Sequence, residues 1–368
     1  MLARFLVVLA LTIPACRITS ASQTSSPNAD AETAPAKHSS SDIAELLKKA
    51  NSGDASAQFE TGRAYETGNG VRENPEQAAL WYRKAAEQGS PKAQNSLGVL
   101  YWSGNGVERD KKEAVQWYRK AARQGDANAM FNIGAAYYNG EGVETVNDTL
   151  AYAWFVLSSE AGSSSGQDAA RRSKSEHRSF TDACFEIGRL YEKGEDLPKN
   201  FDTAAAWYRK AADQGHTQAK IAMATFSMNA KNYSEARHWC EAAAKDRHAG
   251  GYFCLGYIYQ HGLGVEQSSQ AARKWYVEAA KSGNSGAMQV LGQMYAKGDG
   301  TKVDRPQAFL WFFISARHGN RDAILAANQL RTSMSGKEWK DAQKKLRQRN
   351  FDPKQVDVVL RGSAEPVQ

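Results

Sequence analysis

Apolar and small residues recur along the chain at the spacing of an α-helix. Leu97, Tyr101 and Gly104 lie four and three positions apart, and Trp117 and Ala121 lie four positions apart. Residues at this spacing share one face of a helix, so the pattern predicts two consecutive helices. A Gly-x-Gly pair separates them, and a glycine that follows a helix tolerates the left-handed conformation that ends it.

This pair of helices is repeated along the chain. The first three copies start 36 residues apart, and each joins a Gly-x-x-Tyr-x-x-Gly-x-Gly-Val signature to a second helix that contains a tryptophan. A shorter copy, from His216 to Asp246, lacks the Gly-x-Gly loop. The sequence thus predicts an all-α chain of about seven helix-turn-helix units. Complete or partial copies of the signature lie at 58–89, 94–125, 131–154, 187–212, 255–280 and 291–319.

Each unit carries a large aromatic side chain that a single hairpin cannot cover. Trp117 lies on the second helix, while Gly98 and Ala121 let the two backbones approach closely. Burying one indole removes about 150–250 Å² from water, which stabilises by roughly 4–6 kcal/mol as an upper bound. We therefore expect each tryptophan to fill the gap between neighbouring hairpins, so that the units stack into a solenoid.

Two departures interrupt the array. Trp154 and Trp207 are 53 residues apart, about 17 more than one period, so the segment between them is interpreted as an insertion and a seam between two sub-arrays. After Leu330, the residues from Ser335 to Trp339 open a charged helix. We expect this helix to cap the exposed end of the last unit.

The first fifteen residues have the organisation of an export signal. A basic start precedes the apolar segment Phe5 to Ile13, which is too short to span a bilayer as a helix. Ile13-Pro14-Ala15-Cys16 resembles a bacterial lipobox, in which Cys16 would be lipidated; the alternative is simple secretion after cleavage behind Ala21. The expected location is the periplasm, or the outer membrane through a lipid anchor.

A segment rich in Ser, Thr, Ala and Pro follows, and it cannot bury enough apolar surface to fold. The predicted division of the chain is a signal peptide at 1–15, a disordered tether at 16–41, sub-arrays at 42–162 and 182–330, an insertion at 163–181, a capping helix at 331–350 and a tail at 351–368.

The chain has a formal charge of +7 and a pI near 9.0. Basic residues alternate with acids along the predicted helices, as at Arg83, Lys84 and Glu87, which is typical of a solvated helix face. A nucleic-acid-binding protein would cluster its basic residues on one face, so no nucleic-acid partner is expected.

The sequence contains no clear motif for catalysis, a cofactor or a metal. The Gly-x-Gly pairs follow helices rather than strands and lack the third glycine or the Lys-Ser/Thr of nucleotide loops. The seven histidines are scattered, and no Ser-x-x-Lys suggests a β-lactamase-like envelope hydrolase, which is the alternative from another class of function. We expect a protein that is not an enzyme and that holds no cofactor or metal.

The repeated signature resembles that of the Sel-1-like repeat family, a relative of the tetratricopeptide repeat, from about Ala44 to Leu330. The resemblance implies an α-solenoid with a right-handed superhelix that acts as a scaffold or adaptor for protein partners. Envelope members of the family include lipoproteins that help to assemble exopolysaccharide secretion complexes, so polysaccharide machinery is an alternative partner. Any membrane contact is expected only through the lipid anchor.

The related tetratricopeptide fold lines its concave groove with first-helix residues, which predicts a partner-binding surface here. The positions are three before, one after and four after the repeat glycine. Trp102 and Tyr138 occupy the same position in consecutive units, where they either pack against neighbouring helices or anchor a peptide or glycan. The predicted residues are Arg63, Glu66, Asn95, Val99, Trp102, Phe131, Tyr138, Arg189, Glu192, Tyr257, Gln260, Gln289 and Gln293.

Two cysteines lie on consecutive predicted helices. Cys240 is on the second helix of the short copy and Cys254 on the helix that follows, and an exported chain meets an oxidising compartment. Sel-1-like proteins with disulfides place their cysteines where this chain has Ala244 and Tyr252. A Cys240–Cys254 disulfide and two buried thiols therefore both remain open.

Overall fold

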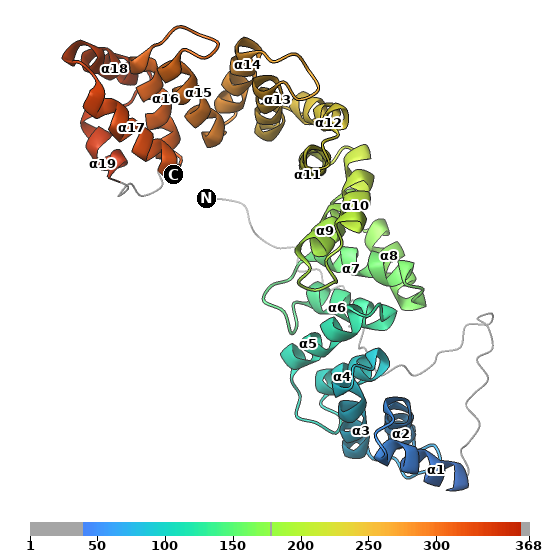
Figure 1. Ribbon diagram of the computed structural model, residues 1–368. Coiled ribbons are helices and arrows are strands. Elements are labelled where there is room, and N and C mark those ends of the chain that lie inside the picture. Colours follow the sequence, from blue (N-terminus) through green and yellow to red (C-terminus); the bar gives the residue numbers. More distant parts are fainter. Residues whose placement is uncertain (1–39, 177–178, 362–368) are drawn as a thin grey trace, which may run out of the picture.

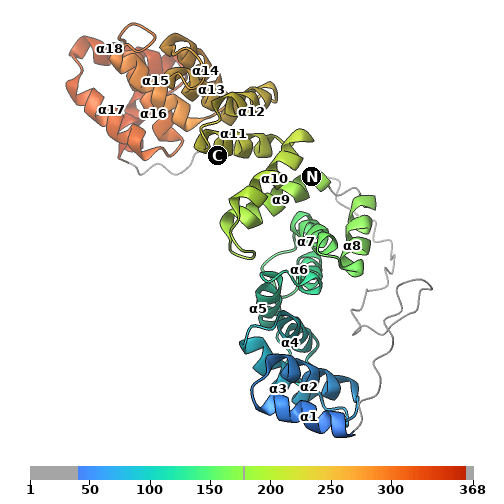
Figure 2. The same cartoon turned by 45° about the vertical axis from the view of Figure 1, so that its right-hand side comes forward.

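The computed structural model describes residues 40–176 and 179–361, and within these residues the protein is helical with no β-strand. Figure 1 shows an elongated, curved stack of helix pairs, and the turned view in Figure 2 shows the same open array without a central core. The predicted α-solenoid is confirmed. Its elements are α1 (Ser40–Asn51), α2 (Ala55–Thr67), α3 (Pro75–Glu87), α4 (Pro91–Ser103), α5 (Lys111–Ala122), α6 (Ala127–Asn139), α7 (Asp148–Glu160), α8 (Ser164–Ser175), α9 (Phe180–Lys193), α10 (Phe201–Asp213), α11 (Thr217–Asn229), α12 (Tyr233–Lys245), α13 (Ala249–His261), α14 (Ser269–Lys281), α15 (Ser285–Lys297), α16 (Arg305–Arg317), α17 (Arg321–Ser333), α18 (Gly336–Gln348), the 3₁₀ turn η1 (Pro353–Gln355) and α19 (Val356–Leu360).

Most first helices of the repeats end at a glycine. In α4, the side chain of Ser90 accepts a hydrogen bond from the Ala93 N–H, which caps the beginning of the helix. Gly104 follows the helix with φ +78°, and its N–H donates to the Leu100 carbonyl. A left-handed glycine also ends α2, α6, α9, α13 and α15, which confirms the predicted role of the first glycine of the pair.

The second glycine of the pair lies against the preceding repeat. Gly106 has φ +72°, and a Cβ atom there would lie 2.2 Å from the carbonyl oxygen of Pro75 at the beginning of α3. Gly142 approaches the carbonyl of Lys111 on α5 in the same way, at 2.3 Å. A larger residue would push each loop away from its neighbour, so the second glycine is needed for contact between repeats.

Within each repeat, an aromatic ring from the second helix lies against the glycine of the first. A Cβ atom at Gly98 would lie 2.6 Å from Cε1 of Tyr118 and 3.1 Å from the carbonyl oxygen of Ala114, both on α5. We predicted that Gly98 lets two backbones approach; the structure shows that a buried ring takes most of the space that the glycine leaves. The same contact joins Gly62 to Tyr82, Gly134 to Phe155, Gly188 to Tyr208, Gly256 to Tyr276 and Gly292 to Phe312.

The tryptophans of the second helices connect neighbouring repeats, as expected. Trp117 on α5 is buried in one core cluster with Tyr82 of the preceding repeat. Trp311 on α16 likewise shares a cluster with Tyr276 of α14. The Nζ of Lys120 lies 3.5 Å from the centre of the Trp117 ring and covers its outer side. Each hairpin therefore completes the core of its neighbour.

The predicted insertion contains the extra helix α8, which packs against α7 and α6. The helix α9, which is the first helix of the following repeat, also packs against α7. As a result, α7 is covered on two sides. This arrangement explains why eight consecutive residues, Ala151 to Ser158, are buried. Trp154 lies at this seam and is completely buried.

The short repeat, α11 and α12, differs from the others at the glycine and at the ring together. Ala224 stands at the glycine position, and Cys240 stands where other repeats have Tyr or Phe. Because a cysteine is smaller than an aromatic ring, an alanine fits opposite it. The turn between the two helices uses Lys231, with φ +58°, in place of a Gly-x-Gly loop.

A disulfide in the structure joins Cys240 of α12 to Cys254 of α13, with the Cα atoms 5.8 Å apart. It links the short repeat to its successor. We predict that the oxidised, denatured chain exposes two reactive thiols when it is unprocessed, and only Cys184 once Cys16 is lipidated or removed. Reduction should lower the free energy of unfolding by roughly 3 kcal/mol, as expected for a loop of about 15 residues. A thiol titration under denaturing conditions tests this, and three or more free thiols would exclude the bridge.

His216 makes the stability of α11 depend on pH. Its Nδ1 accepts a hydrogen bond from the Ala219 N–H at 3.1 Å, and its ring stacks on Phe185. Burial lowers the pKa of His216, against the opposing effect of Asp182 and Glu186. Because the unfolded chain then binds the proton more readily, stability is present above the unfolded pKa and is lost as the pH falls through the folded pKa.

We predict that His216→Asn, which keeps a capping side chain without a titrating ring, weakens this pH dependence. Urea unfolding at about pH 7.5 and about pH 5 should show a smaller loss of stability for the variant than for the wild type. An equal loss in both proteins would contradict the assignment to His216.

The helices α18 and α19 close the C-terminal end of the array. Ala342 and Leu346 of α18 are buried against Phe309 and Phe313 of α16. The predicted capping helix within 331–350 is α18. We placed residues 351–368 in a tail, but residues 356–360 form α19 and belong to the cap, because three of its five side chains are buried: Val356, Val359 and Leu360.

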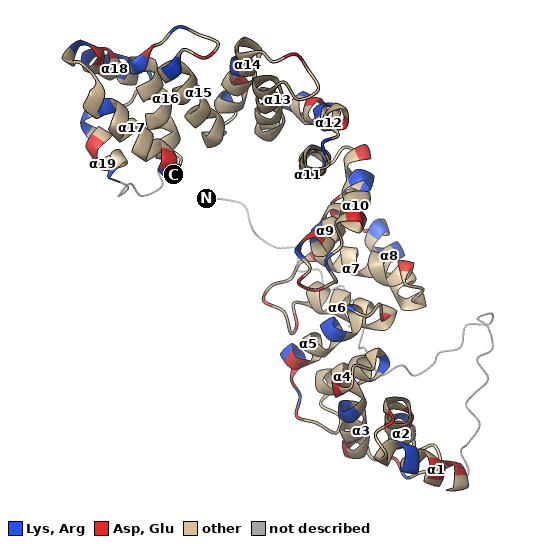
Figure 3. Ribbon diagram, viewed as in Figure 1, with Lys and Arg blue, Asp and Glu red and all other residues tan. Residues whose placement is uncertain are grey.

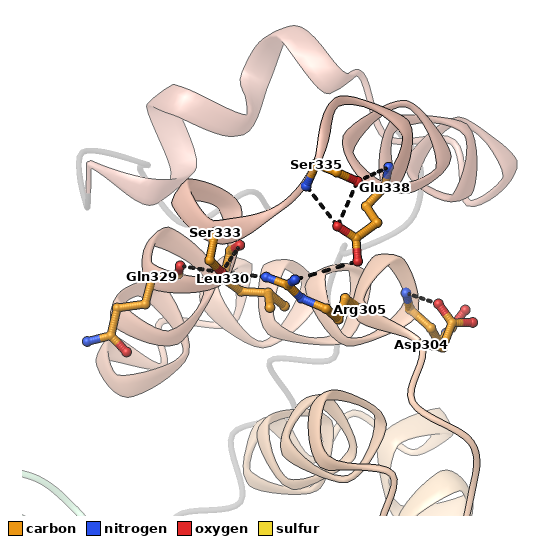
Figure 4. Close-up of polar contacts among 8 residues, drawn as sticks. Asp304, Arg305, Gln329, Leu330, Ser333, Ser335 and Glu338 are labelled. Atoms are coloured by element: carbon orange, nitrogen blue, oxygen red, sulfur yellow. Dashed lines mark hydrogen bonds and ion pairs between the residues drawn. The ribbon is translucent and has the colours of Figure 1, made fainter.

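Polar contacts fix the cap to the last repeat (Figure 4). Arg305 at the beginning of α16 donates to the Ser333 Oγ at 2.5 Å and lies 3.6 Å from the Glu338 carboxylate. Ser335 and Glu338 form a capping box at the beginning of α18. The guanidinium thus connects the beginning of one helix with the end of α17 and the beginning of α18.

Candidate partner-binding surface

The predicted surface residues lie on the first helices α2, α4, α6, α9, α13 and α15. Their side chains have different environments, which depend on the position relative to the repeat glycine. The position four after the glycine lies beside the ring of the second helix. The position three before it lies on the other side of that ring, and the position one after it is the most open of the three.

At the position four after the glycine, three polar side chains accept hydrogen bonds from buried tyrosines. Gln260 Oε1 accepts from the Tyr276 hydroxyl at 2.7 Å. Glu66 accepts from Tyr82 at 2.5 Å, and burial together with this carboxylate raises the pKa of Tyr82 above its usual range. Glu192 bonds Tyr208 in the same way at 2.5 Å. The structure therefore gives Gln260, Glu66 and Glu192 a partner inside their own repeat.

Trp102 and Tyr138 occupy the same position in the next two repeats, with different outcomes. Trp102 is half-buried, and its ring centre lies 6.4 Å from that of Tyr118. Lys111 lies over the ring, with its Nζ 5.1 Å from the centre. Tyr138 is 41% exposed, and the ring that packs on the glycine of its repeat is Phe155. Trp102 is thus partly a core residue, whereas Tyr138 presents its ring to solvent.

The position one after the glycine carries side chains that reach solvent. Arg63 lies 3.4 Å from Glu60, and Arg189 lies 2.9 Å from Glu186, each one turn back on the same helix. Tyr257 is 41% exposed. Val99 is half-buried and Gln293 is exposed. Surface ion pairs of this kind stabilise little, so both arginines can rearrange to contact a partner.

The position three before the glycine packs on the core instead. Phe131 lies 5.7 Å from Phe155, ring centre to ring centre. Asn95 accepts a hydrogen bond from the Asn132 amide of the next repeat at 2.9 Å, and Gln289 accepts one from Asn320 at 3.0 Å. We had placed these side chains on the binding surface, but ring packing and contacts between repeats already engage them. Phe59, Phe185 and Phe253 fill the equivalent positions and pack on Tyr82, Tyr208 and Tyr276.

A cleft of about 440 Å³ lies at the seam, where α8 and α9 both pack on α7. Tyr152, Val156 and Phe180 form its apolar part, and Lys174 lies on its polar side. Ser159 also lines the cleft, and no histidine is among the lining residues. The sequence pointed to an insertion here but not to a cleft, because the spacing of tryptophans does not show how an extra helix packs.

Cys184 is a buried free cysteine in the core of the array. Burial raises the pKa of the Cys184 thiol to about 11, so little reactive thiolate forms near neutral pH. Among residues 40–176 and 179–361, no three His, Cys, Asp or Glu side chains are grouped so that they could hold a metal ion. In the same residues, no helix combines the length and apolar character needed to cross a bilayer. Cys16 lies outside the described residues.

The chain resembles solved repeat proteins and, over a short stretch, one curated protein. The chain is similar to two solved structures: c5321, a protective antigen of uropathogenic Escherichia coli (26% identity, TM-score 0.45, covering 89% of this chain and 84% of that one), and a Sel1 repeat protein from Oxalobacter formigenes (28% identity, TM-score 0.40, covering 79% and 80%). A curated relative is the ERAD-associated E3 ubiquitin-protein ligase component HRD3 of Candida glabrata, 34% identical over 89 residues. That match spans 23% of this chain and 11% of HRD3.

The family model for the Sel1 repeat matches the chain seven times, over more than half of its length. The matched segments are 55–90, 91–126, 127–163, 181–216, 230–248, 251–284 and 285–320. These matches agree with the periodicity of the sequence and with the stacked hairpins of the structure. The chain therefore belongs to the Sel1 repeat family.

Proposed function

We propose that the protein is a non-enzymatic scaffold that binds protein partners along the first helices of its repeats. The observation that supports this most directly is the exposure of aromatic rings on the first helices. Tyr138 and Tyr257 are each 41% exposed, and Trp102, at the position of Tyr138 in the preceding repeat, is half-buried. Exposed tyrosines and tryptophans bury a large area on binding at a low cost in side-chain entropy. The proposed contact residues are Arg63, Val99, Trp102, Tyr138, Arg189, Tyr257 and Gln293.

Asn95 and Gln260 have a different place in this proposal. Asn95 Oδ1 accepts from Asn132 and Gln260 Oε1 accepts from Tyr276, so both amide oxygens are already engaged inside the array. They position the surface and do not serve as its primary contacts.

The experiment is a crosslinking pulldown with a W102A/Y138A variant. We expect capture of partners to fall at least about tenfold, as it does when an aromatic anchor is removed. Because Trp102 also packs on Tyr118, Tyr138→Ala alone separates loss of binding from loss of stability. Phe201→Ala is the matched control, since Phe201 is 53% exposed but lies on a second helix, α10.

Two results would overturn the proposal. Undiminished capture by Tyr138→Ala and by the double variant would show that Trp102 and Tyr138 do not belong to the binding surface. Equal loss of capture by Phe201→Ala would show that the effect is not specific to the first helices.

We further propose that the protein works in a bacterial cell envelope, held there by lipidated Cys16. The support is the apolar segment Phe5 to Ile13 and the lipobox-like residues that precede Cys16. Mass spectrometry of the mature N-terminus should find a lipidated cysteine. An unmodified chain that begins at Ser22 would replace the anchor with simple secretion.

A further inference from the structure

The excess positive charge of the chain is concentrated at its C-terminal end. Residues 305–361 contain twelve Lys and Arg against five Asp and Glu, whereas the rest of the chain contains 35 of each. The formal net charge of +7 therefore belongs to the segment that contains α16, α17 and the cap. Figure 3 shows basic segments on α17 and α18 at this end of the array.

Four of these cations form a row along α18. They are three, four and three positions apart, which places them on one face over about 15 Å of helix. All four are exposed, and the opposite face holds the buried Ala342 and Leu346. The helix is thus fixed by its apolar face with its basic face turned to solvent. The row, called the α18 row below, is Lys337, Lys340, Lys344 and Arg347.

Two acids of the cap are paired with cations outside the row. Glu338 lies 3.6 Å from Arg305, and Asp357 pairs with Arg331. Beyond the cap proper, Asp304 lies 3.4 Å from Lys345. No residue of the α18 row makes an ion pair with any residue that the structure describes.

Asp341, on the same helix, lies next to the α18 row. The exposed face therefore carries three net positive charges. Since the buried face prevents α18 from turning, this charge cannot be compensated from within the cap.

The chemistry of the α18 row indicates what it contacts. Protein interfaces have an aromatic core and few lysines, whereas this row is mostly lysine. The nearest tryptophan, Trp339, packs edge-on against Phe309 at 5.2 Å between ring centres and so offers no anchor beside the row. Lysines act as point charges without the paired geometry of arginine, which suits a continuous layer of anionic headgroups.

We propose that the α18 row docks the C-terminal end of the solenoid on a surface of anionic phospholipid. This contact is separate from the first-helix surface and does not depend on partner binding there. It is also separate from the proposed lipid anchor, because it rests on charge and on the cap, which closes the array at the end opposite α1 (Figure 1).

The test is binding of the full chain to vesicles. Vesicles of phosphatidylcholine with about 30% phosphatidylglycerol should bind the wild type more tightly than pure phosphatidylcholine vesicles at about 0.1 M salt. A K337Q/K340Q/K344Q/R347Q variant should bind the anionic vesicles at least about tenfold more weakly than the wild type. The matched control K92Q/K112Q/K193Q/K245Q removes the same charge from exposed positions elsewhere. It should bind the anionic vesicles as tightly as the wild type does.

Amine acetylation of the wild type gives a second measurement that does not need a variant. Anionic vesicles should slow the acetylation of Lys337, Lys340 and Lys344 and leave that of Lys112 unchanged.

Equal binding of the row variant and the control variant would overturn the proposal. Protection of the row by soluble polyglutamate but not by vesicles would also overturn it, because the row would then bind an acidic chain.

Discussion

Replacing Trp154 with alanine should cost about 3–5 kcal/mol and separate the two halves of the array. Trp154 is completely buried on α7, the helix against which α6, α8 and α9 all pack. Its removal leaves a cavity where the two sub-arrays meet, and a repeat array transmits stability only through contacts between neighbours. Urea unfolding followed by circular dichroism should therefore change from one transition to two.

Trp81→Ala is the matched control for this prediction. Trp81 is also buried, but it lies near the N-terminal end and packs on Ala50 and Ala57. Its loss should destabilise α1 and α2 without separating the sub-arrays. A single transition with an unchanged midpoint in Trp154→Ala would show that α7 does not couple the two halves.

Gly98→Ala should destabilise the protein by about 1–3 kcal/mol, the cost of forcing an extra methyl group into a packed core. In an exposed helix the same change would stabilise by roughly 0.5–1 kcal/mol, so the sign of the effect is diagnostic. The added Cβ would lie 2.6 Å from the Tyr118 ring and 3.1 Å from a backbone carbonyl. Gly336→Ala on α18, where the structure leaves the space open, is the control and should not destabilise.

A double-mutant cycle tests the contact itself. Tyr118→Cys alone should also destabilise, because it leaves a cavity. Combined with Gly98→Ala, it reproduces the pairing of Ala224 with Cys240 in the short repeat. The double variant should be more stable than the sum of the single effects by at least about 1 kcal/mol. Additive effects, or stabilisation by Gly98→Ala, would contradict the conclusion that the Tyr118 ring fills the space beside Gly98.

The repeat was predictable from sequence because its physical requirements recur every 36 residues. Glycines at helix ends and tryptophans between hairpins leave a periodic pattern that spacing alone reveals. The contact between the Tyr118 ring and Gly98 was not predicted. The two residues are 20 positions apart in the sequence, and only the folded hairpin brings them together. Similarly, α19 is only five residues long, too short for periodicity to distinguish it from a tail.

The candidate surface was predicted less completely than the fold. Trp102 and Tyr138 share a position in the repeat, but Trp102 is half-buried beside Tyr118, whereas Tyr138 is 41% exposed. Gln260 occupies the same position and binds Tyr276. A position in a repeat therefore identifies a face of a helix, but residues at that position still differ in their contacts and in how far they reach solvent.

The central claim is that each repeat lacks part of its own core until a neighbour supplies it. Far-ultraviolet circular dichroism of a peptide spanning residues 91–126, compared with residues 55–163, tests this most directly. We predict that the single repeat has the spectrum of an unfolded chain, while the three-repeat fragment is helical and unfolds cooperatively. A helical 91–126 peptide with a cooperative thermal transition would contradict the account.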